Sequence, residues 1–283
     1  MMTQQASKNE IFRLRFAPLK MTVKRNARLL LDLIFPIECL GCGQEGVWFC
    51  PNCLSNLPLL PARHCPFCGQ KNHWGQTCQA CCQSRALAGA IAFIPYANPV
   101  IQKLIQAWKY QGAKNLTQPL SIFVSQGLDA MTLKLREQSR ALESGLSQIR
   151  LATWPALPTL ILSSQTTLVP VPLAPKRLRS RGFNQAEELA LALQAKRGYN
   201  LDGLIKRTRH SAAQATLSGS DRLTNVKQVF ALTTDAASIV NKNFLIIDDV
   251  ITTGSTCEAI ARLLKGSGAA SVWALAIAFG HPL

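Results

Sequence analysis

The chain has 283 residues, of which 48% are hydrophobic, which is enough for one large domain and a small one. Its 31 Lys and Arg against 15 Asp and Glu give a formal net charge of +16, which favours anionic partners: phosphorylated metabolites, nucleic acid or a membrane surface. No apolar run reaches the roughly 18 residues of a membrane-spanning helix, and no small-residue cleavage site follows the basic start, so we expect a cytoplasmic protein without a membrane span.

Residues 1–35 form the first predicted region, a basic tail that ends in a short helix. The helix is expected over 26–35, and Pro36 ends it because proline cannot continue a helix. The tail favours a solvated, partly disordered segment over an arm that binds nucleic acid.

The next region, 36–85, is rich in cysteine and poor in apolar periodicity. It contains four C-x-x-C units, and two sulfurs at this spacing lie on one tight turn and can share a metal ion. Two such turns complete a tetrahedral thiolate site, which suits zinc, so four turns predict two structural zinc sites. The simplest grouping is sequential: Cys39, Cys42, Cys50 and Cys53 in one site, and Cys65, Cys68, Cys78 and Cys81 in the other.

Alternatives to this assignment remain open at the level of sequence. A crossed grouping is possible, Cys82 could replace Cys81, and His64 and His73 are reserve ligands. Disulfides are disfavoured in a cytoplasmic chain, and redox pairs are disfavoured because four pairs crowd one small segment.

From residue 88 onward, apolar strand patterns alternate with helical ones, which predicts an α/β fold with a parallel sheet. Strands are expected over 89–96, 166–172, 243–250 and 269–278, with a short one within 200–209. Helices are expected over 98–111, 121–149 and 254–268, and a further one in the second part of 176–198, ending near Gly198. The basic stretch before residue 185 is expected to be a loop at the carboxyl edge of the sheet, where such sheets bind ligands.

The stretch FLIIDDVITTGST, residues 244–256, carries the clearest chemistry. An apolar strand ends at two carboxylates, Asp248 and Asp249, and a loop of Thr252, Thr253, Gly254, Ser255 and Thr256 leads into a helix. Ser255 and Glu258 have the spacing of a capping box. Backbone N–H groups and hydroxyls at a helix start suit a phosphate, and the acids suit sugar hydroxyls or Mg²⁺. Together they describe a site for ribose 5-phosphate.

This stretch resembles the phosphoribosyl-diphosphate (PRPP) motif of type I phosphoribosyltransferases without a gap. The resemblance implies that Asp248 and Asp249 contact the ribose hydroxyls, and that Thr252 to Thr256 bind the 5′-phosphate. It also implies Mg²⁺ bound together with PRPP. The loop that follows the earlier strand binds diphosphate in that family, and the best candidates here are Arg177 and Arg181, with Asn184 and Gln185 as polar support.

Four segments in order also resemble the ComF/ComFC (GntX-like) competence proteins. They are the cysteine turns, LIQAWKYQGAKNL, LVPVPLAPKRLRSRGFNQAEELA and RHSAAQATLSGSDRLTNVKQVF. The resemblance covers about 36–118 and 166–281, and implies a double zinc-ribbon-like domain followed by a phosphoribosyltransferase-like domain over 88–283, with an insertion at about 120–165. It further implies a role in natural competence, with the DNA-uptake machinery as partner.

Two functions fit these observations. In the first, the protein is a phosphoribosyltransferase, and the polar stretch 210–226, with Gln214, Arg222 and Asn225, covers the site. In the second, it is a non-catalytic PRPP sensor that binds single-stranded DNA through its zinc ribbons and basic loops. Four aromatic residues among the cysteines could stack on bases or could cover the metal sites: Trp48, Phe49, Phe67 and Trp74. Lys109 fits either the site or the surface.

Overall fold

The computed structural model describes residues 36–72, 74–143, 163–208, 229–233 and 235–280. Several predictions therefore concern residues outside the described ranges. They are the basic tail with its helix over 26–35, His73, the second part of the expected insertion, and the cover over 210–226.

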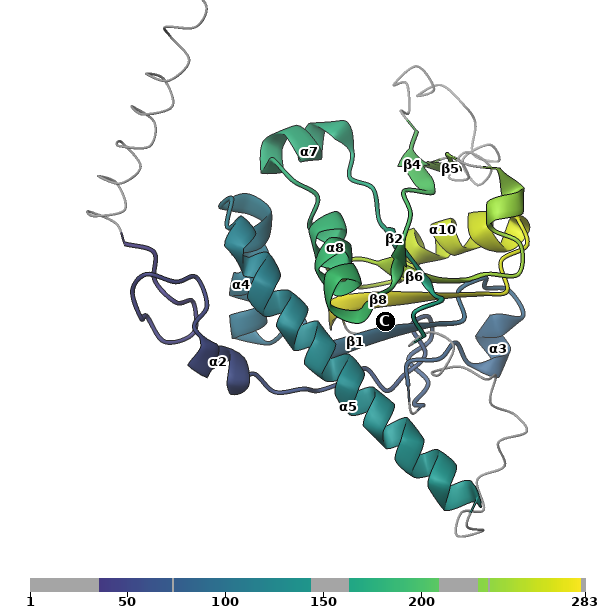
Figure 1. Cartoon of the computed structure of the whole chain (residues 1–283), viewed down its shortest axis with the longest axis horizontal. Helices are drawn as coiled ribbons and strands as arrows, with labels where there is room; N and C mark the ends of the chain where they lie inside the picture. The colour runs from purple at the N-terminus through teal and green to yellow at the C-terminus, as the bar shows by residue number, and fades with distance from the viewer. Residues whose placement is uncertain (1–35, 73, 144–162, 209–228, 234, 281–283) are drawn as a thin grey trace, which may run out of the picture. The chain divides into compact units, whose positions relative to one another are not determined.

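A parallel sheet lies at the centre of the second half of the chain (Figure 1). Its strands stand in the order β1 (Gly89–Pro95), β8 (Ser271–Phe279), β6 (Asn243–Ile247), β2 (Thr167–Pro170) and β3 (Asn200–Leu201), and β7 (Val250–Ile251) also pairs with β8. Each of these pairings is parallel. The predicted α/β fold is confirmed.

Strand β8 is the last strand in sequence and lies in the middle of the sheet. All of its residues from Val272 to Ala278 are buried, because neighbouring strands flank it and helices cover both of its faces. A strand buried on both faces is expected to be a continuous apolar run without alternation, and VWALAIA is one. Its register with β6, Ile246 beside Ala274 and Ile247 beside Leu275, fixes where the following acids emerge.

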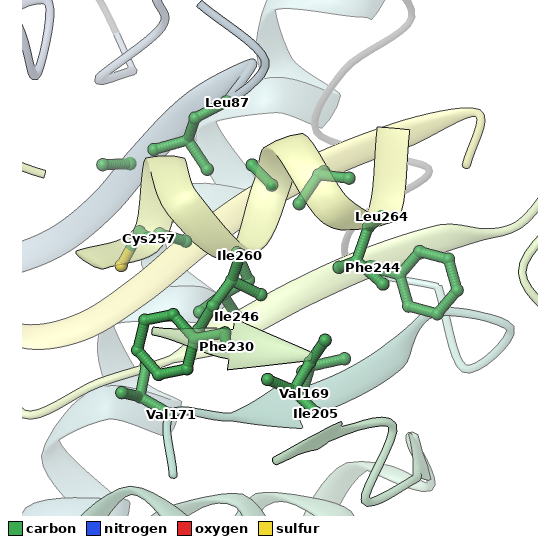
Figure 2. Packing of buried hydrophobic residues seen from close by; sticks show 14 of the residues in the cluster. Leu87, Val169, Val171, Ile205, Phe230, Phe244, Ile246, Cys257, Ile260 and Leu264 are labelled. Carbon is green, nitrogen blue, oxygen red and sulfur yellow. The ribbon is translucent and has the colours of Figure 1, made fainter. Parts of the chain in front are cut away.

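Helix α10 (Ser255–Gly266) lies over one face of the sheet. Figure 2 shows Cys257, Ile260 and Leu264 on the helix side and Phe244 and Ile246 on the strand side of one buried cluster. The three helical positions are spaced so that they share one side of the helix, which explains why this sequence buries that stripe.

Helices α4 (Pro99–Tyr110), α5 (Thr117–Glu143) and α8 (Gln185–Arg197) complete the helical cover of the sheet. Helix α5 packs on Phe93, on the face of the sheet opposite to α10. The neighbouring Ala92 belongs to the cluster under α10, and successive strand residues point to opposite faces. A Cβ atom at Gly127 would lie 2.5 Å from the Phe93 ring, so a glycine is needed where the helix comes this close. The predicted helix over 121–149 thus begins four residues early, at Thr117.

The shorter elements connect these layers. They are α2 (Pro51–Ser55), α3 (Gln79–Cys82), η1 (Lys114–Leu116), α7 (Pro175–Arg181), η5 (Ala236–Ser238), and an antiparallel pair of β4 (Ile205–Arg207) and β5 (Phe230–Leu232).

The basic stretch predicted to be a loop is helical instead. Helix α7 contains Lys176, Arg177, Arg179 and Arg181. Pro175 occupies the first helical position, and Gly182 ends the helix in the left-handed conformation with φ 79°. Lys, Arg and Leu are good helix formers, so the seven-residue helix, about two turns long, is stable enough to form between these two residues.

The chain divides into two compact units, residues 1–53 and 54–283. The first cysteine group lies in the first unit, and the second group lies in the same unit as the sheet. The domain boundary near residues 85–88 stays a prediction from sequence.

Candidate functional site

The acid pair lies at the carboxyl end of β6, the edge at which parallel α/β sheets bind ligands. Strand β8 holds its backbone: the N–H of Asp248 donates to the carbonyl of Leu275 at 3.0 Å, and the N–H of Ile277 donates to the carbonyl of Asp249 at 3.2 Å. Both side chains are half-buried. The backbone of both acids is therefore hydrogen-bonded to the central strand β8.

The two carboxylates differ in their partners. Asp248 Oδ1 accepts a hydrogen bond from the backbone N–H of Asp249 at 2.8 Å, and Asp249 Oδ1 accepts one from Val250 N–H at 2.7 Å. The remaining oxygen of Asp249, Oδ2, lies 2.6 Å from Lys109 Nζ. Burial, and next the charge of Asp249, raise the pKa of Asp248 to about 7. Asp248 therefore gains or loses a proton near neutral pH.

The loop Thr252–Thr256 follows at once and opens α10. Gly254 has φ 67°, a left-handed conformation that favours glycine, and its carbonyl accepts the first helical bond from Glu258 N–H at 2.8 Å. Thr253 Oγ1 lies 3.0 Å from Ser255 Oγ, and both side chains are exposed. Together with Asp248, the loop lines an open hollow of about 210 Å³. The hollow combines hydroxyls and the start of a twelve-residue helix, which suits an anion.

The predicted capping box between Ser255 and Glu258 is wrong. Gly254, not Ser255, is the residue before the helix and makes no side-chain cap, while Thr253 Oγ1 accepts from the Ser255 N–H at 3.4 Å. Glu258 is instead 4% exposed, and its carboxylate accepts hydrogen bonds from the backbone N–H groups of Ala86 and Leu87 at 3.0–3.1 Å. Arg262 completes this arrangement with a 2.7 Å ion pair. Glu258 therefore pairs with the distant N–H groups of Ala86 and Leu87 and does not form the local cap with Ser255.

The predicted diphosphate residues lie on or just after α7. Arg181 donates to Gln185 Oε1 at 3.0 Å, and its guanidinium lies 5.2 Å from the ring centroid of Tyr110. Arg177 is exposed. Arg181 is thus joined through Tyr110 to the end of α4, where the neighbouring Lys109 reaches the acid pair.

Asn184 and Gln185 are buried and already hold structural partners. Asn184 accepts from Ala186 N–H at 3.2 Å as the cap of α8, and donates to the Val171 carbonyl at 3.1 Å. Gln185 donates to the Trp108 carbonyl at 3.0 Å. They fix the start of α8 against β2 and α4, and a direct contact with PRPP stays a prediction.

The eight predicted zinc ligands form two groups in sequential order. Within each group of four, the sulfur atoms lie within 4.8 Å of one another. The groups are Cys39, Cys42, Cys50 and Cys53, and Cys65, Cys68, Cys78 and Cys81. Cys82 lies outside the second group, and its thiol donates to the Gln79 carbonyl at 3.1 Å. Two groups of four cysteines suggest two zinc sites.

Thiols this close compete for protons. The backbone N–H of Cys81 and the neighbouring sulfurs lower the pKa of Cys78 to about 7, while the Cys78 side chain and burial raise the pKa of Cys81 to about 12. Backbone N–H groups also point at the sulfurs, as from Cys50 to Cys39 Sγ at 3.3 Å and from Cys78 to Cys65 Sγ at 3.4 Å. The donor set fits zinc, because a divalent cation removes the conflict by binding four thiolates.

The aromatic residues among the cysteines do not form an open stacking surface. Phe49 and Trp74 are buried, at 7% and 8% exposure, and Trp48 and Phe67 are half-buried. This supports the interpretation that they cover the cysteine clusters.

Comparison with known proteins identifies the two halves of the chain. Residues 178–281 match a phosphoribosyl transferase domain, and residues 30–82 match a double zinc ribbon domain. Competence protein F of Haemophilus influenzae is 28% identical over 252 residues, which cover 86% of this chain and 97% of that protein. DNA utilization protein YhgH of Salmonella typhimurium is 32% identical over 225 residues, which cover 72% and 91%. The chain belongs to the ComF family.

A more distant ComF relative is similar over nearly the same length. Competence protein ComFC of Streptococcus pneumoniae is 24% identical over 255 residues, which cover 83% of this chain and 97% of that protein. The family and the arrangement of a zinc ribbon before a phosphoribosyltransferase domain are as the sequence predicted. In the ranges that the structure describes, no helix is both long and apolar enough to cross a membrane.

Proposed function

We propose that this chain binds PRPP together with Mg²⁺ at the carboxyl edge of its sheet, and that it acts in natural competence on the cytoplasmic side. The observation that carries the proposal is the position of Asp248 and Asp249, one loop away from the anion-binding start of α10. The match to a phosphoribosyl transferase domain and relatives named for competence and DNA utilization support it.

In this proposal the 5′-phosphate lies on the loop Thr252–Thr256. Gly254, at φ 67°, allows the tight turn in which backbone N–H groups can cradle a phosphate. The hydroxyls of Thr252, Thr253 and Ser255 are exposed, and those of Thr253 and Ser255 would exchange their mutual hydrogen bond for the phosphate oxygens. The dipole of α10 favours the negative charge.

The ribose lies over the acid pair. Ionised Asp248 and Asp249 accept hydrogen bonds from the two sugar hydroxyls, which are stronger when the acceptor is charged. Because Lys109 neutralises one of the two charges, the pair can ionise fully without leaving two unbalanced charges in a half-buried site. Mg²⁺, when bound with PRPP, would offset the charge of the diphosphate and carboxylate oxygens.

The diphosphate of PRPP requires cationic donors, and in this proposal Arg177, Arg181 and Lys109 supply them. Arg177 and Arg181 lie on α7, and Lys109 lies at the end of α4. In the transfer reaction, a nitrogen nucleophile attacks C1 of the ribose, and the bond from C1 to the diphosphate oxygen breaks with its electron pair remaining on the diphosphate. The three cations stabilise this developing charge while the acids hold the ribose.

Calorimetric titration of PRPP with Mg²⁺ into the full chain tests the proposal. Binding by the wild-type protein, lost in the double variant Asp248→Asn with Asp249→Asn while the melt stays cooperative, is the expected result. Equal affinity in the double variant would mean that PRPP does not lie on the acid pair. Diphosphate release, screened across nucleobases and with single-stranded DNA, decides whether transfer follows binding.

A second candidate function is binding of single-stranded DNA with PRPP as a regulator and without transfer. The observation that favours it is the surface of α7: the helix carries four basic residues, and one of them, Arg181, stacks on Tyr110, which is 72% exposed. An exposed aromatic ring among cations is the usual platform for single-stranded nucleic acid. The zinc-ribbon aromatics are less suitable because they are buried or half-buried.

Two variants separate these functions. Tyr110→Ala should weaken DNA more than PRPP, because Tyr110 offers a ring to a base, whereas PRPP would lose only a contact that positions Arg181. Arg177→Ala with Arg181→Ala should weaken PRPP more than DNA if these arginines serve the diphosphate. A loss for DNA alone in the arginine variant would reassign α7 to nucleic acid, and salt-independent DNA binding would argue against this surface.

A further inference from the structure

We propose that Phe67, at the tip of the turn between Cys65 and Cys68, holds the phosphate loop, Thr252–Thr256, in its binding conformation. Zinc in the second cysteine group would then set the affinity for PRPP, and zinc in the first group would not. This inference rests on the proposed function, because the affected site is the phosphate loop. Phe67 acts here as a positioning residue and does not contact the ligand.

The first observation is a direct approach between the two elements. Pro66 and Phe67 are the two residues between the ligands Cys65 and Cys68, so they form the tip of that turn. A Cβ atom on Gly254 would lie 3.5 Å from Phe67 Cε1 and 3.9 Å from the Pro66 carbonyl oxygen. The turn therefore stands in van der Waals range of the one loop residue with positive φ.

The second observation is a small cavity that joins the same two elements. His64 and Pro66 line it from the cysteine segment, and Ile251 and Thr252 line it from the start of the phosphate loop. The His64 ring also meets Phe279 edge to face at 5.3 Å, at the end of the central strand β8. The zinc turn thus borders the loop along its first residues as well as at Gly254.

A third set of contacts ties the other end of the second cysteine group to α10. The backbone N–H groups of Ala86 and Leu87 donate to Glu258, and Arg262 donates to the Ser84 carbonyl. Arg85, between them, places its guanidinium 4.6 Å from the centroid of the Phe67 ring. Helix α10 is therefore held along its first two turns by the segment that follows Cys81, and at its start by the turn that precedes Cys68.

These contacts make the loop dependent on the metal. A four-thiolate turn without its cation loses the force that closes it, because the thiolates repel and the thiols no longer share a centre. Phe67 would then move away from Gly254, and the loop would lose the packing contact that supports its backbone conformation. Among the described residues, the contacts with the loop given above come from the second group, so we expect no equivalent effect from the first group.

The test compares three variants of the full chain: Phe67→Ala, Phe67→Leu and Phe49→Ala. Phe49 is the matched control, since it is a buried aromatic beside a ligand of the first group. For each variant, zinc per chain, PRPP affinity by calorimetry, and hydrogen–deuterium exchange of the amides at 252–257 are measured. The exchange measurement reports on the loop whether or not PRPP binds.

With two zinc ions retained, Phe67→Ala should weaken PRPP on the order of 10- to 100-fold, the range typical of groups that orient a ligand-contacting residue. Exchange at 252–257 should speed up while exchange in β1 stays unchanged. Phe67→Leu should retain most of the PRPP affinity and of the exchange protection at 252–257, because leucine still fills the space. Phe49→Ala should change neither the affinity nor the exchange.

The outcomes separate this inference from the proposed function. Faster loop exchange in Phe67→Ala together with no PRPP binding by the wild type would retain the positioning role and overturn the proposed function. Tight wild-type binding with an unchanged loop in Phe67→Ala would overturn the positioning role alone. An equal loss of PRPP affinity in Phe49→Ala would also overturn the positioning role of Phe67, since the effect would no longer be specific to the second cysteine group.

Discussion

Lys109 Nζ lies 2.6 Å from Asp249 Oδ2, an ion pair that joins the end of α4 to the acid pair after β6. The side chains of Lys109 and Asp249 are only 18% and 13% exposed, so the pair is partly shielded from water and stronger than a surface salt bridge. Lys109 also lowers the pKa of Asp248, against the larger effects of burial and of Asp249 that raise it. One lysine thus serves the fold and the charge balance of the site together.

Lys109→Ala is therefore expected to weaken PRPP on the order of 10- to 100-fold, the effect of losing one charged hydrogen bond. It should also lower the free energy of unfolding by about 1–2 kcal/mol, because Asp249 is left half-buried without a cation. Calorimetry and a thermal melt measure the two effects. Lys103→Ala, an exposed lysine on the same helix, is the control. Unchanged PRPP affinity in Lys109→Ala would limit Lys109 to a structural role.

Asp248 makes stability depend on pH in a predictable direction. Its folded pKa is about 7, against an ordinary value of 3.8, so the folded chain keeps a proton that the unfolded chain has already lost. The stabilisation is complete below about pH 4 and is lost as the pH rises through about 7.

Asp248→Asn removes this dependence, since asparagine carries no ionisable proton. The variant should melt above the wild type at pH 8, by several degrees, and the gap should narrow at pH 5.5. Asp202→Asn, at an exposed position, controls for the substitution itself. A gap that stays constant between the two pH values would contradict the raised pKa of Asp248.

Metal content should follow the two cysteine groups. Protein purified without added zinc is expected to hold two zinc ions per chain, one for each group of four sulfurs. Cys39→Ser with Cys42→Ser should retain one ion, and Cys65→Ser with Cys68→Ser should also retain one. Mass spectrometry under native conditions counts the ions. A single zinc in the wild type would mean that only one of the two groups is a metal site.

Gly254→Ala tests the backbone of the phosphate loop. A side chain at φ 67° costs roughly 1–2 kcal/mol, so the variant should either lose that stability or shift the loop and bind PRPP more weakly. Gly266→Ala, at the end of the same helix with open space around it, should be neutral or slightly stabilising. Wild-type stability and affinity in Gly254→Ala would show that the loop does not need this conformation.

The sequence predicted those features that depend on neighbouring residues. The spacing of the cysteine pairs, the apolar run before Asp248, and the alternation of strands and helices are local patterns. Each of them led to the structure that is observed: two groups of four sulfurs, acids at a strand end, and a parallel sheet. Local patterns failed where two of them disagreed. In α7 the basic composition suggested a loop, but Pro175 begins a helix and Gly182 ends it.

Only the tertiary structure decided which side chains meet across long stretches of chain. Glu258 has the spacing of a helix cap, but its partners are Ala86 and Leu87. Nothing around Lys109 in sequence indicates Asp249, and nothing around Phe67 indicates Gly254. The sequence by itself therefore determined which functional groups are present: two sets of four cysteines, and a Thr/Ser/Gly loop beside two acids. The packing of the sheet decided which of these groups contact one another. Contacts between distant residues depend on how strands and helices are layered, and the spacing of neighbouring residues does not encode this layering.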